Sequence, residues 1–159
     1  MIIRSGRTRD AEDVAAFWNP MIRDTAVTFN SLEKTPAQIA ADIASRGAGF
    51  QVAEEEGQVI GFATYFPFRS GPGYARTREH TIVLAPRAQG RGLGRALMQA
   101  LVRAARADGI HVLIAGVSAE NPAGVAFHEA IGFSRVATLP QVGRKFDRWM
   151  DLVLLQRLL

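Results

Sequence analysis

The stretch Val83–Arg95, VLAPRAQGRGLGR, carries the strongest structural signal in this 159-residue chain. It starts at the end of an apolar run, turns at Pro86, passes three closely spaced glycines and enters a segment whose leucines recur at helical spacing. This order predicts a strand, a tight glycine turn and a helix. Glycine adopts positive φ without strain, and the first turn of a helix presents unpaired N–H groups and the positive end of its dipole. The stretch therefore predicts a cradle for a phosphate or diphosphate group.

The spacing of these glycines separates the motif from two familiar phosphate-binding loops. A P-loop requires Gly-Lys followed by Ser or Thr, which the chain lacks. A dinucleotide fingerprint requires G-x-G-x-x-G in the first strand-to-helix turn, whereas Gly90, Gly92 and Gly94 follow G-x-G-x-G in mid-chain. A glycine-rich turn that merely opens a surface helix remains the alternative to a ligand cradle. Positive charge that suits a polyanionic ligand comes from Arg87, Arg91 and Arg95.

Length and composition predict one soluble domain that spans residues 1–159. Hydrophobic residues make up 48% of the chain and charged residues 21%, and no run approaches the roughly 18 consecutive apolar residues of a membrane span. The N-terminus has no secretory signal pattern. The absence of cysteine excludes disulfides, thiolate metal sites and a cysteine nucleophile. We therefore expect a cytoplasmic protein with no membrane partner.

The net positive charge of the chain does not indicate nucleic-acid binding. The formal net charge is +4, but the arginines are scattered along the chain and form no basic block with interleaved aromatic residues. A weak basic excess also raises the rate at which an enzyme encounters anionic ligands. We therefore expect no nucleic-acid partner.

Periodicity and capping signals predict a mixed α/β sheet of about seven strands with about four helices. Two helix starts carry capping residues, Thr35 with Gln38 and Asn121 before Pro122. Pro20 is expected to bend the first helix or to end it early. The expected strands are 2–4, 50–53, 59–66, 78–84, 111–117, 133–139 and 149–155, and the expected helices begin near residues 10, 36, 92 and 122.

Two motifs together resemble the GNAT superfamily of N-acetyltransferases, which bind acetyl-coenzyme A. The loop Gln89–Gly94 resembles the pyrophosphate loop Q/R-x-x-G-x-G/A of that family. Asn121-Pro122, followed by FHEAIGF at 127–133, resembles the helix that comes later in the family. The resemblance covers nearly the whole chain. It implies a single-domain α/β fold of GNAT type, with a mixed and mostly antiparallel sheet.

Within the family, three stretches resemble the phosphinothricin and methionine sulfoximine acetyltransferases, namely 77–81, 127–133 and 140–149. Members of that subgroup acetylate the α-amino group of small amino-acid analogues and often form homodimers. The implied function is acetyl-CoA-dependent N-acetylation of phosphinothricin, methionine sulfoximine or methionine sulfone. A protein or peptide N-acetyltransferase and a non-catalytic acyl-CoA-binding module remain as alternatives.

The resemblance also implies which residues contact acetyl-CoA. Pantetheine is expected to pair with the backbone of the strand before the loop, and the diphosphate is expected to lie on the loop itself. Asn121 is expected to reach the pantetheine amides as well as to cap its helix. The implied coenzyme contacts are Ile82, Val83, Leu84, Gln89, Gly90, Arg91, Gly92, Leu93, Gly94, Arg95, Asn121 and His128.

Acetyl transfer to an amine requires a neutral amine, a stabiliser for the oxyanion and a proton for the departing thiolate. The resemblance places a base at Glu79, acting directly or through a water, and an exposed strand carboxylate is the alternative. A backbone N–H around Val83 is expected to stabilise the oxyanion. His128 stands where many members have a tyrosine, so we expect it to contact the coenzyme or to protonate the thiolate. The histidines lack metal-ligand spacing, so no metal is expected.

An arginine is the natural partner for a substrate carboxylate or phosphinate, because its planar fork forms two parallel hydrogen bonds. Arg69 is the first candidate, with Arg76 and Arg78 behind it. Lys145 and Trp149 are expected to line a pocket shared across a dimer, or Trp149 packs on the sheet. Phe29 walls the pocket or belongs to the core. The implied substrate contacts are Phe29, Arg69, Arg78, Glu79, His80 and Thr81.

Overall fold

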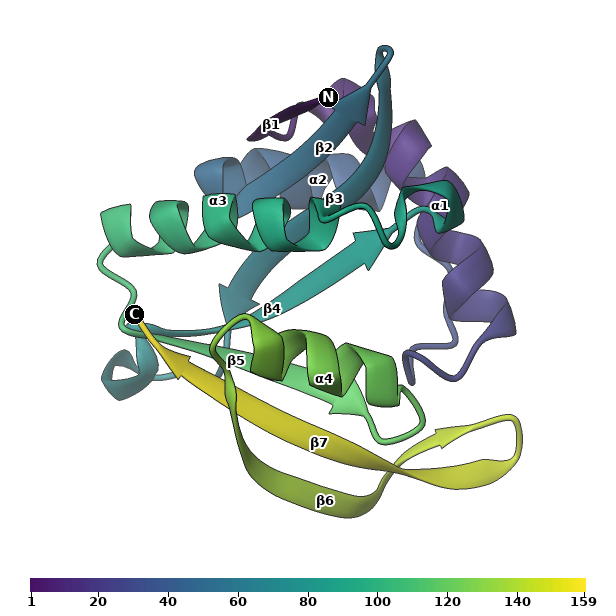
Figure 1. Ribbon diagram of the computed structural model, residues 1–159, viewed down its shortest axis with the longest axis vertical. Helices are drawn as coiled ribbons and strands as arrows, with labels where there is room; N and C mark the ends of the chain where they lie inside the picture. The colour runs from purple at the N-terminus through teal and green to yellow at the C-terminus, as the bar shows by residue number, and fades with distance from the viewer.

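A mixed sheet of seven strands forms the centre of the computed structural model, which describes residues 1–159 (Figure 1). The strand order is β1-β2-β3-β4-β5-β7-β6, and every neighbouring pair is antiparallel except β4 and β5. The predicted α/β class and mostly antiparallel sheet are confirmed. The strands are β1 (Ile2–Ser5), β2 (Phe50–Glu55), β3 (Gln58–Pro67), β4 (Thr77–Leu84), β5 (Val112–Ser118), β6 (Ser134–Lys145) and β7 (Arg148–Leu158).

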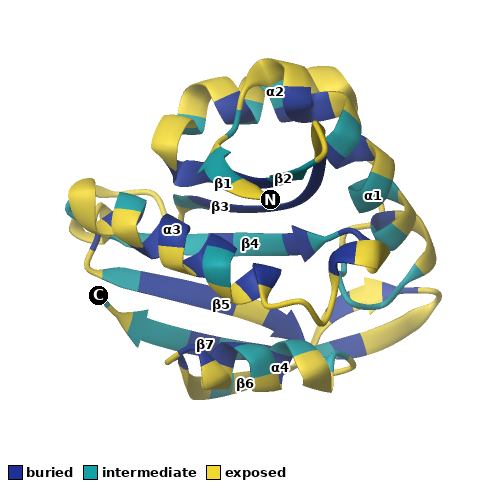
Figure 2. Cartoon of the chain, turned by 45° about the horizontal axis from the view of Figure 1, so that its top comes forward, coloured by how far each residue is buried: buried dark blue, intermediate teal, exposed yellow.

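Four helices cover the two faces of this sheet, and two hydrophobic clusters lie beneath them (Figure 2). One cluster joins Val14 and Ile39 of the first two helices to Phe62 of β3. The other joins Leu97 of the third helix and Val125 of the fourth to the opposite face. None of the helices combines the length and apolar character needed to cross a bilayer. The helices are α1 (Ala11–Asp24), α2 (Pro36–Arg46), α3 (Leu93–Ala107) and α4 (Pro122–Ala130).

The predicted capping residues begin the second and fourth helices. The Thr35 hydroxyl accepts a hydrogen bond from the Gln38 N–H at 3.2 Å, and the Gln38 side chain accepts one from the Thr35 N–H at 2.9 Å. Asn121 Oδ1 accepts from the Gly124 N–H at 2.9 Å. These contacts satisfy N–H groups that the helix itself leaves unpaired, so the chain enters α2 and α4 at fixed positions.

Helix α1 continues through Pro20 to Asp24, so of the two expected effects of this proline, a bend or an early end, the early end is wrong. Proline removes one N–H and crowds the preceding turn, and the loss is tolerated when packing holds the residues beyond it. Ile22 is fully buried on this last turn. The Thr25 N–H closes the helix by donating to the Met21 carbonyl at 3.2 Å.

The hairpin of β6 and β7 is longer than predicted, since the sequence indicated strands only at 133–139 and 149–155. The two strands stay paired across Pro140 because the register shifts between Leu139 and Gly143, with Gln141 at a positive φ of 56°. A bulge of this kind accommodates a residue that cannot donate to the ladder. The irregular stretch lacks alternation, which is why periodicity missed it.

Candidate active site

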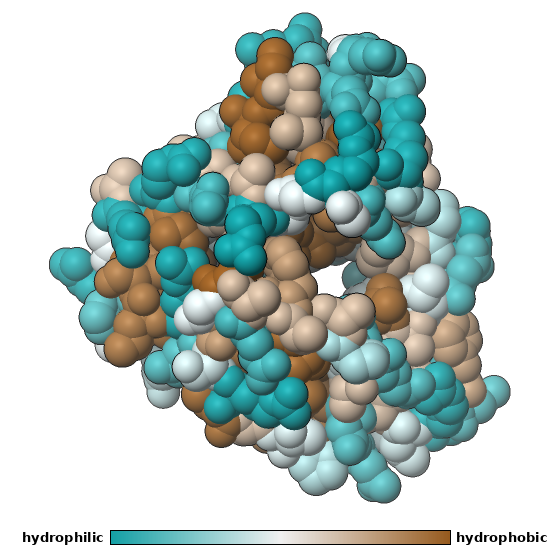
Figure 3. All heavy atoms as spheres, in the orientation of Figure 1, coloured by the Kyte–Doolittle hydropathy of each residue, from teal (hydrophilic) through white to brown (hydrophobic).

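Strands β4 and β5 separate partway along their length, and a cavity of about 980 Å³ opens between them. They pair in parallel only from Thr77–Val112 to His80–Ala115, after which β4 runs on to Leu84 and β5 to Ser118. Residues of α1, α4, the glycine loop and both strands line the opening. In the orientation of Figure 1, the space-filling view is hollowed between the end of β4 and α4 (Figure 3).

The free edge of β4 offers backbone groups to this cavity. The Ala85 N–H donates to the Ile60 carbonyl on β3 at 2.9 Å. Hydrogen bonds of an antiparallel pair alternate along the strand, so the N–H of Val83, which is opposite Phe62, also points to β3. The N–H and carbonyl groups of Ile82 and Leu84 therefore face the cavity. Of the N–H groups around Val83, from which oxyanion stabilisation is expected, those of Ile82 and Leu84 are on the cavity side and that of Val83 itself is not.

The glycine loop places a row of unpaired amides at the mouth of the cavity. The N–H groups from Gly90 to Arg95 have no hydrogen-bond partner, and Gln89, Gly90 and Gly94 line the opening. Gly92 is the residue before α3 and has a left-handed φ of 78°. Such a loop, followed by the positive end of a helix, suits an anion. Leu93 contributes only backbone, because its side chain is buried in the core.

The arginines of this loop are held by other partners. Arg91 and Glu55 form an ion pair at 2.6 Å on the surface. Arg87 donates to a glutamine side chain at 2.8 Å, and Arg95 approaches a carbonyl at the end of α4 at 3.4 Å. None of the three guanidinium groups lines the cavity. The amides are therefore the groups nearest to a ligand in this arrangement.

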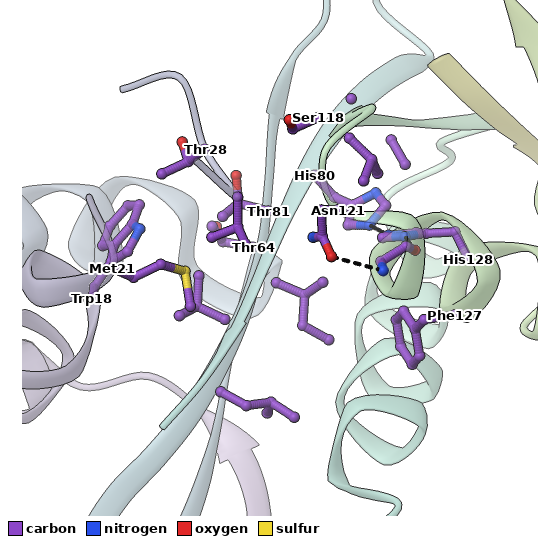
Figure 4. Close-up of a pocket in the computed structure, with 18 of the residues that line it drawn as sticks. Trp18, Met21, Thr28, Thr64, His80, Thr81, Ser118, Asn121, Phe127 and His128 are labelled. Carbon is purple, nitrogen blue, oxygen red and sulfur yellow. Dashed lines mark hydrogen bonds between the residues drawn. The ribbon is translucent and has the colours of Figure 1, made fainter. Parts of the chain in front are cut away.

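Glu79 projects from β4 into the cavity, on the side of α1. A Cβ placed on Gly116 would lie 3.2 Å from Glu79 Oε1, so the carboxylate occupies space that the missing side chain on β5 leaves open. Burial raises the pKa of Glu79 above the usual carboxyl value. Thr81 and Thr64 line the same side (Figure 4). The site thus holds a half-buried carboxyl group suited to accepting a proton.

His80 lies on the opposite face of β4, because side chains alternate along a strand. It is buried and contacts His128 of α4, with the two Nε2 atoms 3.0 Å apart. Figure 4 shows the two rings together, beside Asn121 at the start of α4. All three residues line the cavity. The structure therefore groups His80 with His128, on the other side of β4 from Glu79 and Thr81.

Phe29 lies in the connection between α1 and α2 and lines the cavity, as do Trp18 and Met21. Its ring packs on Gly143 of β6, where an added Cβ would come within 2.6 Å of three ring carbons. Residues distant in the sequence thus build one apolar wall. Phe29 both lines the cavity and packs on the hairpin.

The predicted substrate arginines lie outside the cavity. The Arg69 guanidinium lies 5.5 Å from the centroid of the Phe68 ring, and Arg78 donates to backbone carbonyls near the start of β4. The cations that line the cavity are Arg46 and Lys34, which the sequence did not indicate. Arg46 donates to Thr64 at 3.3 Å and pairs with Asp42 at 3.1 Å. The only signal for Arg46 was a basic residue in the last turn of its helix.

Lys145 points into its own chain rather than toward a shared pocket. Its ammonium lies 2.5 to 3.0 Å from four backbone carbonyl oxygens, those of Ile22, Thr25, Thr28 and Asn30, which share its three N–H groups. The lysine therefore fixes the connection that carries Phe29. Trp149 on the neighbouring strand is 58% exposed. No group of three or more potential metal ligands occurs in the structure.

Comparisons with known proteins agree with these features. A model of the Acetyltransferase (GNAT) family matches residues 17–133. The L-amino acid N-acyltransferase MnaT of Escherichia coli K12 is 38% identical, covering 98% of this chain and 92% of MnaT. The L-methionine sulfoximine/L-methionine sulfone acetyltransferase of Salmonella typhimurium is 36% identical, covering 98% and 93%. A GNAT superfamily phosphinothricin acetyltransferase from Sinorhizobium meliloti, in complex with acetyl-CoA, has a TM-score of 0.92 and 30% identity, covering 99% and 88%.

Proposed function

Since this chain belongs to the acetyltransferase (GNAT) family, we propose that it transfers the acetyl group of acetyl-CoA to the α-amino group of a small amino-acid analogue. The proposed substrates are methionine sulfoximine, methionine sulfone and phosphinothricin, which the names of similar proteins contain. The observation that carries the proposal is one cavity that joins a row of free amides, an open strand edge and a half-buried carboxyl group.

The residues around the glycine loop fit the coenzyme. Free amides from Gly90 to Arg95 suit its diphosphate, and the outward N–H and carbonyl groups of Ile82 and Leu84 suit the amides of pantetheine. When bound, acetyl-CoA supplies the thioester whose acetyl group is transferred. The proposed contacts remain Ile82, Val83, Leu84, Gln89, Gly90, Arg91, Gly92, Leu93, Gly94, Arg95, Asn121 and His128, with Arg91 and Arg95 contributing charge from outside the cavity.

Three groups of the chain carry out the three parts of the proposed reaction. Glu79 accepts a proton from the amine, directly or through a water, and its raised pKa brings it closer to the working range of a base near neutral pH. A backbone N–H of Ile82 or Leu84 stabilises the oxyanion, in place of Val83, because those N–H groups point into the cavity. His128, across the cavity, protonates the departing thiolate or contacts the coenzyme.

Substrate binding involves the side of the cavity that contains Glu79. Phe29 and Thr81 line that side, and Arg46 is the arginine placed to meet a carboxylate there. Arg69 and Arg78 keep the role expected from the sequence only if the connection between β3 and β4 folds over the opening. Replacing Arg46 and Arg69 by methionine in separate variants and comparing KM for the amine distinguishes the two arrangements.

We also propose a homodimer formed through the β6–β7 hairpin. The hairpin carries several exposed apolar side chains, and a second copy of the chain packed against the hairpin would bury them. Light scattering coupled to size exclusion tests this, with Trp149→Arg expected to yield monomers. The exposed side chains are Val136, Leu139, Val142, Phe146 and Trp149.

A cytoplasmic location remains part of the proposal, and cell fractionation tests it.

Thiol release from acetyl-CoA tests the proposed activity. We expect turnover with the three amino-acid analogues and none with peptides. Glu79→Gln should lower kcat by about a hundredfold or more, with unchanged affinity for acetyl-CoA in calorimetry. Glu12→Gln, an exposed carboxylate of α1, is the matched control and should behave as the parent. Turnover only with peptides would favour a protein acetyltransferase, and binding without turnover would favour an acyl-CoA-binding module.

A further inference from the structure

The two buried histidines beside the cavity each use one ring nitrogen on a backbone carbonyl. His80 Nδ1 lies 3.1 Å from the Ile114 carbonyl oxygen, and His128 Nδ1 lies 2.7 Å from the Gly124 carbonyl oxygen. A carbonyl oxygen only accepts hydrogen bonds, so both contacts are hydrogen bonds only when each Nδ1 carries a proton. A neutral imidazole has one N–H, and its other nitrogen then carries a lone pair.

The remaining nitrogens of the pair face each other. Nε2 of His80 and Nε2 of His128 are 3.0 Å apart, the distance of an N–H···N hydrogen bond. If both rings were neutral, two lone pairs would meet at this distance. One added proton turns the contact into a charge-assisted hydrogen bond. Three N–H groups then satisfy both carbonyls and both Nε2 atoms.

The other protonation states fit the geometry less well. A neutral pair satisfies the central contact only if one ring moves its proton from Nδ1 to Nε2, which turns the Nδ1 lone pair of that ring toward a carbonyl oxygen and brings two acceptors face to face. A doubly charged pair would place two N–H groups head to head. Burial lowers the pKa of both rings, and the charge of His128 lowers that of His80 further, to about 3, so a second charge on the pair is opposed most strongly.

No other charged group faces the pair. On β4, Glu79 points to the opposite face of the sheet, and β5 contributes only the Ile114 carbonyl. Helix α4 contributes His128 and the Gly124 carbonyl, and the residue before β6 contributes the uncharged Phe133 ring, whose centroid lies 5.2 Å from that of His80. No carboxylate forms an ion pair with either ring. The state of each histidine is therefore set by the other and by the two carbonyls.

We propose that His80 and His128 hold a single proton between their Nε2 atoms, and that His80 is a positioning residue that keeps His128 supplied with the proton for the departing sulfur. The second half of this proposal rests on the proposed acetyl transfer. As the carbon–sulfur bond breaks, sulfur leaves with the bonding electrons and takes the shared proton from Nε2 of His128. The pair becomes neutral, and a proton from solvent, equal in number to the one that Glu79 takes from the amine, restores it.

Nitrogen NMR of the ¹⁵N-labelled protein tests the shared proton without substrate. The chain has three histidines, and His111, which is exposed, is the internal reference. Near neutral pH we expect three protonated nitrogens among the four of His80 and His128, with one strongly deshielded proton between the two Nε2 atoms. Two protonated nitrogens, or four, would overturn the proposal whether or not the protein is an acetyltransferase.

Variants of His80 test the positioning role. Burial already lowers the pKa of His128 in the parent, and His80→Phe removes the acceptor that shares its proton, so we expect the proton to be lost at lower pH in the variant. The basic limb of the pH profile of kcat should move to lower pH. We expect kcat near neutral pH to fall about tenfold or more, with KM for acetyl-CoA unchanged. His80→Gln, which keeps a polar group, covers the case in which the phenylalanine variant fails to fold. His111→Gln is the control, and an unmoved basic limb in both His80 variants would refute the role.

Discussion

The ammonium of Lys145 lies 2.5 Å from the carbonyl oxygen of Ile22, so a lysine near the end of the chain closes the last turn of α1. The same ammonium lies within hydrogen-bond distance of three further carbonyls, including that of Thr28 at 2.9 Å. Helix ends leave carbonyls unpaired, and a cation there also meets the negative end of the dipole. The connection that walls the amine side of the cavity is thereby tied to the β6–β7 hairpin.

Lys145→Met should destabilise the protein and weaken amine binding together. Methionine retains most of the side-chain volume but leaves buried carbonyls unpaired, which costs about 2 kcal/mol of unfolding free energy. We expect KM for the amine to rise more than KM for acetyl-CoA, because Thr28 and Phe29 line only the amine side. Urea unfolding and steady-state kinetics measure the two effects. Arg103→Met, on an exposed position of α3, is the control, and equal changes in both KM values would contradict the prediction.

Gly143→Ala should displace the Phe29 ring. A Cβ at this position would lie 2.4 to 2.6 Å from three carbons of the ring, closer than any real contact allows. We expect a loss of about 1–3 kcal/mol in unfolding free energy and a raised KM for the amine. Gly73→Ala is the matched control, since nothing lies within 4 Å of its Cβ and its φ is not positive. A parent-like KM in the Gly143 variant would show that the ring does not border the amine.

Protonation of Glu79 should cause the fall of kcat/KM at acid pH, which is the acid limb of its pH profile. Burial raises its pKa, so the carboxylate form needed for proton removal is lost at a higher pH than for an ordinary glutamate. The folded-state pKa lies above the unfolded value, so the group favours folding at low pH and that contribution is lost as pH rises through the folded pKa. Glu79→Gln should therefore lack the acid limb and unfold at a temperature no lower than the parent near neutral pH. A retained limb would assign the base to another residue.

Gly92→Ala should weaken acetyl-CoA binding more than Arg91→Ala does. Gly92 has a φ of 78°, which costs a residue with a side chain about 1–2 kcal/mol, although no atom would obstruct the new methyl group. The strain would disturb the row of amides before α3. Arg91 is paired with Glu55 at the surface, and its loss removes charge without moving the loop. Calorimetry with acetyl-CoA compares the two, and the reverse order would mean that the arginine charge contributes more to coenzyme binding than the loop amides do.

The parts of the structure that local chemistry dictates were predictable from the sequence. Glycine spacing after an apolar run, the Thr35 and Asn121 caps and the alternating strands are signals carried by neighbouring residues. They predicted the sheet, the glycine loop and the start of each capped helix. Pro20 shows the limit of such rules, because burial of Ile22 holds the helix beyond a residue that normally ends one.

The parts that depend on distant segments were not predictable in the same way. Arg46 lines the cavity only because α2 packs beside β3, and Lys145 meets carbonyls more than a hundred residues earlier in the chain. His80 was expected among the substrate contacts, but its ring meets His128, 48 positions away. Arg69, the leading candidate for a substrate carboxylate, lies outside the cavity. Such pairings follow from tertiary packing, which no local pattern encodes.

Within the sheet, four register pairs from Thr77–Val112 to His80–Ala115 form the whole seam between two antiparallel ribbons, β1–β4 and β5–β7–β6. Beyond this seam, the backbone edges diverge and are left without a neighbouring strand. A molecule that forms hydrogen bonds with both edges would connect the two antiparallel parts of the sheet. A ligand bound in this gap would therefore raise the stability of the folded protein as well as position a reactant. Any ligand that binds only the native state stabilises it by mass action.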